Sequence, residues 1–109
     1  MKKLLAVVAG LLFAVSAYAQ QSDKISVRDM HVAPGPAPQA QYLTGVATNQ
    51  TTSELRTVIL EFNLYDSQNA QVGNTSAVTQ NLAGNGVWKF QALTVQPFSY
   101  AKLVKVIAN

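Results

Sequence analysis

Apolar and polar residues alternate along most of the chain beyond Gln20, which is the period-two pattern of half-buried strands. The alternation is clearest between Leu55 and Asp66, where every second residue from Val58 to Leu64 is apolar. No segment beyond Gln20 shows helical periodicity. The pattern predicts an all-β antiparallel sandwich of six to seven strands, the arrangement that buries one face of each strand. The segments expected to form strands are Ile25–Val32, Gln41–Asn49, Leu55–Asp66, Ala70–Gln80, Val87–Val95 and Phe98–Ile107.

Two irregular positions are expected in the first two strands. Ile25 and Val27 share one face whereas Met30 and Val32 have the opposite parity, so a bulge near Asp29 would bring both pairs to the core. In the second strand, Gly45 indicates either a bulge or close backbone packing.

The second half of the chain carries its own turn and bulge signals. Asp66 suits the first position of a type I turn, and Asn69 suits a left-handed residue that closes the hairpin. We expect the returning strand to lie near an edge, with Val72 and Val78 pointing inward. Further on, Trp88, Phe90 and Ala92 share one face, and Trp88 is interpreted as a core residue, with exposure for carbohydrate stacking as the alternative. Lys102 and Lys105 differ in parity, which indicates a bulge between them or a departure of Lys105 from the sheet.

The first nineteen residues resemble a targeting segment rather than part of the fold. Met1-Lys2-Lys3 is positively charged, Leu4–Ala17 is uncharged and apolar, and Ala17-Tyr18-Ala19 is a small-x-small cleavage site. The apolar run is shorter than the roughly 20 residues that a spanning helix needs. We therefore expect a signal peptide at 1–19, a mature domain at 20–109 that begins with Gln20, and a periplasmic or secreted protein. The alternative is a retained membrane anchor.

Removal of this segment changes the charge balance. Eight Lys and Arg residues fall to six when Lys2 and Lys3 are removed, against five acidic residues, so the net charge becomes +1. Six scattered cations predict neither a nucleic-acid surface nor a site for anionic membranes. We also expect no membrane span after cleavage. The chain has no cysteine, which excludes disulfides and thiolate sites.

The residue inventory favours a protein without catalysis. His31 is the single histidine, so a histidine pair for a metal cannot form, and no serine lies in a nucleophile-elbow sequence. Glu54 and Glu61 are seven residues apart on a strand pattern, which points them to opposite faces. We therefore expect no enzyme activity, catalytic residue, cofactor or metal site.

One ordered set of motifs resembles a known family. Phe62-Asn63-Leu64-Tyr65-Asp66 matches the F-x-L-Y-D motif that gives the FxLYD domain family its name. The stretch from Gly45 to Asn49 resembles the family's G-x-V-x-N segment, and Leu82-Ala83-Gly84 followed by Phe90 resembles a later one. The chain departs from the family at Ala83, where proline is usual, and at Asn69, where glycine is usual. The resemblance implies an immunoglobulin-like sandwich on an exported protein and implies no reaction.

Three functional hypotheses follow from these observations. Ile59 and Tyr65 are apolar on an otherwise polar strand face, which favours a small exported module that binds a protein or envelope partner. Binding would use this face or strand addition at the edge formed by 70–80. The second hypothesis is a structural or stress-related envelope protein that associates with itself. The third is an unfamiliar carboxylate-based hydrolase using Asp66 and Glu61. The family-motif residues are interpreted as mainly structural, with a ligand role for Tyr65 and Asp66 as the alternative; they are Gly45, Asn49, Phe62, Leu64, Tyr65, Asp66, Gly84 and Phe90.

Overall fold

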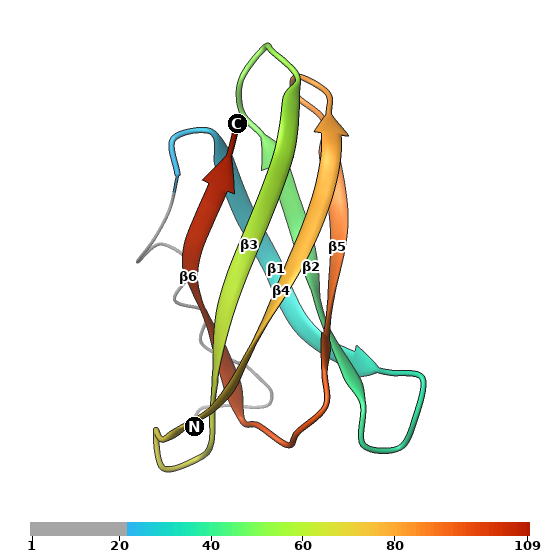
Figure 1. Ribbon diagram of the computed structural model, residues 1–109, viewed down its shortest axis with the longest axis vertical. Helices are drawn as coiled ribbons and strands as arrows, with labels where there is room; N and C mark the ends of the chain where they lie inside the picture. Colours follow the sequence, from blue (N-terminus) through green and yellow to red (C-terminus); the bar gives the residue numbers. More distant parts are fainter. Residues whose placement is uncertain (1–21) are drawn as a thin grey trace, which may run out of the picture.

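The computed structural model describes residues 22–109, which form a two-layer β-sandwich (Figure 1). The signal peptide expected at 1–19 and its cleavage residues Ala17, Ala19 and Gln20 lie outside the described residues. Six strands are present: β1 Ile25–Pro34, β2 Gln41–Asn49, β3 Leu55–Tyr65, β4 Gln71–Leu82, β5 Val87–Thr94 and β6 Tyr100–Ala108. Every bound lies within two residues of the predicted one, and the all-β prediction is confirmed.

Two three-stranded sheets make up the two layers. One sheet has the order β1-β2-β5 and the other has the order β4-β3-β6, with all neighbours antiparallel. Figure 1 shows the second sheet lying across the first, with β3 in the middle of its layer. Each sheet therefore combines two strands that follow each other in sequence with one strand from the last quarter of the chain.

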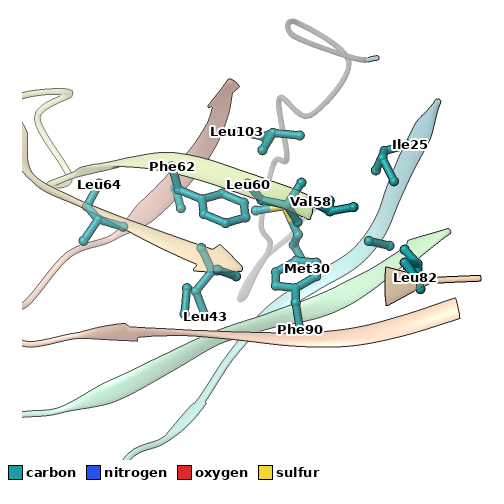
Figure 2. Packing of buried hydrophobic residues seen from close by; sticks show 14 of the residues in the cluster. Ile25, Met30, Leu43, Val58, Leu60, Phe62, Leu64, Leu82, Phe90 and Leu103 are labelled. Atoms are coloured by element: carbon teal, nitrogen blue, oxygen red, sulfur yellow. The ribbon is translucent and has the colours of Figure 1, made fainter. Parts of the chain in front are cut away.

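The core lies between the layers and is centred on β3. Val58, Leu60, Phe62 and Leu64 are fully buried, as the alternating pattern predicts. Figure 2 shows their side chains directed toward those of the facing sheet. The rings of Phe62 and Phe90 stack with centroids 5.6 Å apart and join the two sheets. The remaining buried apolar residues are Ile25, Met30, Leu43, Ala47, Leu55, Ala77, Leu82, Ala92, Ala101 and Leu103.

The bulge expected in β1 is present. Arg28 pairs with Val46 and His31 with Thr44, so two residues are passed over, and Asp29 adopts a positive φ of 59°. This shift buries Met30 on the same side as Ile25. The expectation for Val32 is wrong, since its side chain is 39% exposed. Figure 1 shows that this end of β1 extends past the strands of the facing sheet.

The inward face of β4 differs from the prediction. Val72 is 37% exposed and Val78 is 56% exposed, whereas Ala77 is buried. Directly paired residues point to the same face of a sheet, and Ala77 pairs with the buried Leu60. The register to β3 therefore sets the face of β4, and hydrophobicity alone selected the wrong parity.

Three other local predictions are confirmed. A Cβ atom added at Gly45 would lie 3.1 Å from the Arg28 carbonyl oxygen and 2.5 Å from Phe90 Cζ, so the close packing expected here involves a neighbouring backbone and also the Phe90 ring. The half-buried Trp88 packs against the core, with its ring 5.8 Å from that of Phe90. Between Lys102 and Lys105, the register to β3 passes over one residue, which is the expected bulge.

Candidate binding face

The family-motif residues on the strands are parts of the core. Phe62 and Leu64 are fully buried on β3, and Phe90 is buried on β5. Gly45 lies opposite Phe90 in the β2–β5 ladder and makes room for its ring. These four positions therefore support the sandwich and present no group to a ligand.

Asn49 is the main polar residue of the interior. Its Nδ2 group donates to the carbonyl oxygens of Ser53 at 2.8 Å, Leu82 at 3.1 Å and Ala83 at 2.9 Å. Its Oδ1 accepts from the backbone N–H of Thr51 at 2.9 Å. One buried side chain thus ties the loop after β2 to the loop after β4, and both loops connect the two sheets.

Gly84 belongs to the same corner of the sandwich. A Cβ atom at this position would overlap the backbone carbonyl of Thr52. The loop after β4 can therefore pack on the loop after β2 only with glycine here. Asn49 and Gly84 are accordingly structural residues, and the sequence pattern alone did not reveal that both hold the loop after β2 to the loop after β4.

Asp66 fixes the hairpin between β3 and β4. Its Oδ1 atom accepts from the backbone N–H groups of Gln68 at 2.8 Å and Ala70 at 3.0 Å. Asn69 has a φ of 68°, the left-handed conformation expected from the sequence. The turn role predicted for Asp66 is confirmed.

The outer surface of sheet β4-β3-β6, which we call the β3 face, carries the predicted partner residues Ile59 and Tyr65. Cross-strand register places an apolar row at one end, where Ile59 lies between Val78 and Ile107. The two middle rows are polar, and Tyr65 pairs with Tyr100 at the other end. The β3 face consists of Val78, Ile59, Ile107, Ser76, Glu61, Lys105, Asn74, Asn63, Lys102, Tyr65 and Tyr100.

An aromatic and cationic cluster forms the tyrosine end of this face. The rings of Tyr65 and Tyr100 stack with centroids 5.0 Å apart and planes 13° apart. Lys102 Nζ lies 5.2 Å from the centroid of the Tyr65 ring, within cation–π range. The Tyr100 hydroxyl donates to Asn69 Oδ1 at 2.8 Å. Two half-exposed aromatic rings are therefore stacked on each other, and the Tyr100 hydroxyl is held by Asn69.

A shallow polar depression of about 350 Å³ lies in the middle of the β3 face. Glu61 and Asn63 of β3, Asn74 and Ser76 of β4, and Val104 of β6 line it. It offers amide, hydroxyl and carboxylate groups to a partner. The β3 face thus combines a polar centre with an apolar and an aromatic end.

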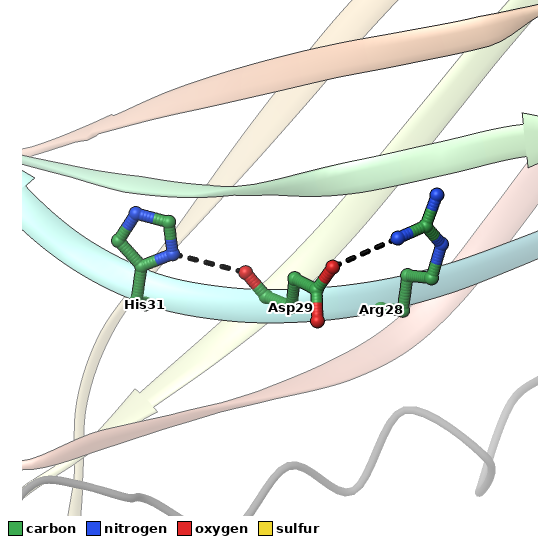
Figure 3. Close-up of polar contacts among 3 residues, drawn as sticks. All are labelled: Arg28, Asp29 and His31. Carbon is green, nitrogen blue, oxygen red and sulfur yellow. Dashed lines mark hydrogen bonds and ion pairs between the residues drawn. The ribbon is translucent and has the colours of Figure 1, made fainter.

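The outer surface of the other sheet holds the single histidine. Figure 3 shows Asp29 between Arg28 and His31. Arg28 Nη1 lies 2.8 Å from Asp29 Oδ2, and His31 Nδ1 lies 3.0 Å from the Asp29 carbonyl oxygen. The other ring nitrogen of His31 contacts the hydroxyl of Thr44 at 2.9 Å. All of these contacts lie at or beside the β1 bulge, and we interpret these exposed groups as structural.

The strand edge suggested by the sequence for strand addition is engaged within the domain. Thr75 of β4 donates its hydroxyl to the carbonyl of Leu93, and Gln96 Nε2 donates to the carbonyl of Val72 at 3.0 Å. These bonds close the side of the sandwich where β4 faces β5. The edge at 70–80 is therefore not free along its length.

Sequence reasoning identified Ile59 and Tyr65 but missed the residues beside them. Tyr100, Lys102 and Ile107 lie on β6, about 40 residues further along the chain. Only the pairing of β3 with β6 brings them onto one surface. A sequence signal for them existed in the alternation of β6, but it did not specify the neighbouring strand.

Residues 22–109 contain no group of three or more histidine or carboxylate side chains arranged to hold a metal ion. Over the same range, no helix is long and apolar enough to cross a membrane. In comparisons with known proteins, no family model, curated protein or solved structure matches the chain.

Proposed function

We propose that the chain is a small exported, non-catalytic interaction module that binds a protein or envelope partner through the β3 face. The observation that carries this proposal is the rigid Tyr65–Tyr100–Lys102 cluster on an outer sheet surface. Tyrosine is enriched at protein interfaces because a rigid ring gives a large contact area while its hydroxyl stays hydrated. The export part rests on the first nineteen residues of the sequence.

The apolar end of the β3 face supports the same proposal. Val78 is 56% exposed and lies in one row with the half-buried Ile59 and Ile107. A partner that covers this row would remove apolar surface from water, worth roughly 25 cal/mol per Å². The polar depression between the two ends would then supply hydrogen bonds that orient the partner.

The proposed fold family is the immunoglobulin-like sandwich. In such domains the second and fifth strands pair in one sheet, and the third pairs with a late strand in the other. The β2–β5 and β3–β6 ladders agree with this topology. The resemblance to the FxLYD family stays a prediction, and it names an exported domain of the same fold.

The test is affinity capture with matched variants. The mature 20–109 protein is immobilised, an envelope extract of the native host is passed over it, and bound proteins are identified by mass spectrometry. We expect one saturable partner that is lost with Ile59→Asp and with Tyr65→Ala. Val87→Asp is the control, because Val87 is 58% exposed on the opposite sheet and its substitution should leave binding unchanged.

Two outcomes would contradict the proposal. If both β3-face variants retain every partner of the wild type while remaining folded by circular dichroism, this face is not the binding site. Recovery of the chain alone would favour a self-associating envelope protein instead.

A further inference from the structure

The four edges of the two sheets are not equally protected. The β1 edge carries the Asp29 bulge and ends at Pro34, and both features hinder strand addition. The bulge of β6 lies at Val104 and leaves the register from 105 to 108 regular. The β4 and β5 edges face each other and are joined by side-chain bonds to their carbonyls. In the described part of the chain, the outer edge of β6 receives one such contact, from Lys24 Nζ to the Ala108 carbonyl at 3.3 Å.

We propose that the outer edge of β6 accepts an extended acidic segment of a partner protein as an added strand of sheet β4-β3-β6. The inference rests on the proposed interaction function but uses the backbone edge of β6, which adjoins the β3 face and shares Lys102 and Lys105 with it. Variants at Val106, which lies outside the β3 face, and at Ile59 or Tyr65, which lie on β3, therefore distinguish a failure of one proposal from a failure of the other.

The backbone of β6 presents its hydrogen-bonding groups in the required direction. Asn109 donates to the Thr57 carbonyl at 3.1 Å, so its N–H points toward β3. The register from 105 to 108 is regular, and successive residues of a strand turn their N–H and C=O groups to opposite sides. Val106 and Ala108 consequently point these groups away from β3. The contact of Lys24 with the Ala108 carbonyl agrees with this direction.

An apolar margin lies beside this edge. The side chains of Val106 and Ala108, and of Val27 on β1, are half-buried and pack against the core. Figure 1 shows that β1 and β6 are near each other where β6 ends and separate toward its start. An added strand would place every second side chain over this margin and complete its burial.

The charges along the edge favour carboxylates on the opposite face of the added strand, the face that does not cover the apolar margin. Lys102 and Lys105 lie on β6, and Lys24 lies at its end. Within residues 22–109 the single ion pair joins Arg28 and Asp29, so these three ammonium groups have no carboxylate within 4.0 Å in that range. Glu61 lies opposite Lys105 on the β3 side, and an acidic strand would add carboxylates on the open side of the three lysines.

The same lysines argue against a second copy of the chain as the occupant. Symmetric antiparallel pairing of two β6 strands about Val106 would place the two Lys105 residues on diagonal positions of one face. Diagonal neighbours are about 7–8 Å apart, where like charges repel. Edge lysines are a common device against such self-pairing.

The test uses a fluorescein-labelled synthetic peptide of ten residues in which valine and glutamate alternate. Binding to the mature 20–109 protein is followed by fluorescence anisotropy. One control peptide has lysine in place of glutamate, and another is N-methylated at alternate residues, which removes one row of N–H donors. We expect saturable binding of the acidic peptide alone.

Two matched variants isolate the backbone contribution. Val106→Pro removes the outward backbone N–H. Val106→Ala keeps this N–H and removes a similar amount of side-chain packing. Loss of this donor and the clash of the ring should weaken binding at least about tenfold relative to Val106→Ala. Lys105→Glu should shift the preference from the glutamate to the lysine peptide.

Amide hydrogen exchange keeps the test independent of how the proline variant folds. In the wild-type protein, the acidic peptide should slow exchange at Val106 and Ala108 by about tenfold or more. No peptide binding, equal binding of the N-methylated peptide, or unchanged exchange at these amides would overturn the proposal. If the wild-type chain dimerises and Val106→Pro abolishes the dimer, the occupant of the edge is a second copy of the chain, and the proposal is overturned. Capture that depends on Ile59 and Tyr65 alone would overturn the edge proposal and leave the proposed function standing.

Discussion

Replacing Asn49 with alanine should remove about 3 kcal/mol from the free energy of unfolding. The side chain is fully buried and makes four hydrogen bonds to backbone groups of two loops. Each bond contributes about 1 kcal/mol on balance, and the full sum is reduced because water reaches the part-buried carbonyls of Ser53 and Ala83. Domains of this size have a total stability of roughly 5–10 kcal/mol, so the loss is a large fraction of it.

Urea unfolding followed by tryptophan fluorescence measures this loss through Trp88. With a slope of about 1–1.5 kcal/mol per molar urea, the midpoint should fall by about 2–3 M. Asn74→Ala is the matched control, since Asn74 is exposed on the β3 face and should change stability by less than about 0.5 kcal/mol. A loss below about 1 kcal/mol at Asn49 would refute the view that its side chain holds the two loops together.

Asn49→Asp tests the same contacts by pH. An ionised carboxylate cannot donate to the three carbonyl oxygens, and burial among them would raise the pKa of the introduced carboxyl above its unfolded value. The folded state then binds more protons than the unfolded state, so stability falls as the pH rises from about 4 through the raised pKa. Stability that instead rises over this range would contradict the donor role of Nδ2.

Three further substitutions test the core and the turn by thermal or urea unfolding. Gly45→Ala should destabilise by about 1–3 kcal/mol, because its Cβ would lie 2.5 Å from Phe90 Cζ, and Phe90→Leu in the same chain should recover part of the loss. Phe62→Ala should cost about 3–5 kcal/mol as a fully buried ring; a cost under 1 kcal/mol would contradict its central position. Asp66→Ala should cost about 1 kcal/mol, and Asp66→Asn less, since an amide oxygen still accepts the two turn bonds; equal losses would contradict the turn role.

Most of the strands could be predicted because each depends on local alternation. β3 is the best case, since burial of every second residue assigns its side chains to the two faces without ambiguity. The faces of β4 could not be predicted in this way. Its valines are more hydrophobic than Ala77, yet the register to β3 turns Ala77 inward. That register depends on the β3–β4 hairpin and on a shift at the end of β3, which residue types alone do not specify.

The candidate site likewise contains residues that the sequence identifies and residues that depend on the whole fold. Ile59 and Tyr65 interrupt the polar face of one strand, so sequence alone identifies them. Tyr100 and Lys102 complete the cluster from a strand whose neighbour depends on the sheet order, which is a property of the whole fold. The hydrogen bonds of Asn49 to the loop after β4 were missed for the same reason, because Leu82 is 33 residues away.

The order of the strands also determines when the domain can fold. Each sheet has its third strand from the last 23 residues, β5 in one and β6 in the other. A chain that has not yet released β5 and β6 holds two strand pairs with their apolar faces open to water, and isolated pairs of strands are marginally stable at best. Pairings of such large sequence separation make folding slow, on the order of milliseconds to seconds. The nascent chain therefore reaches a stable fold only when β5 and β6 are free to complete the two sheets.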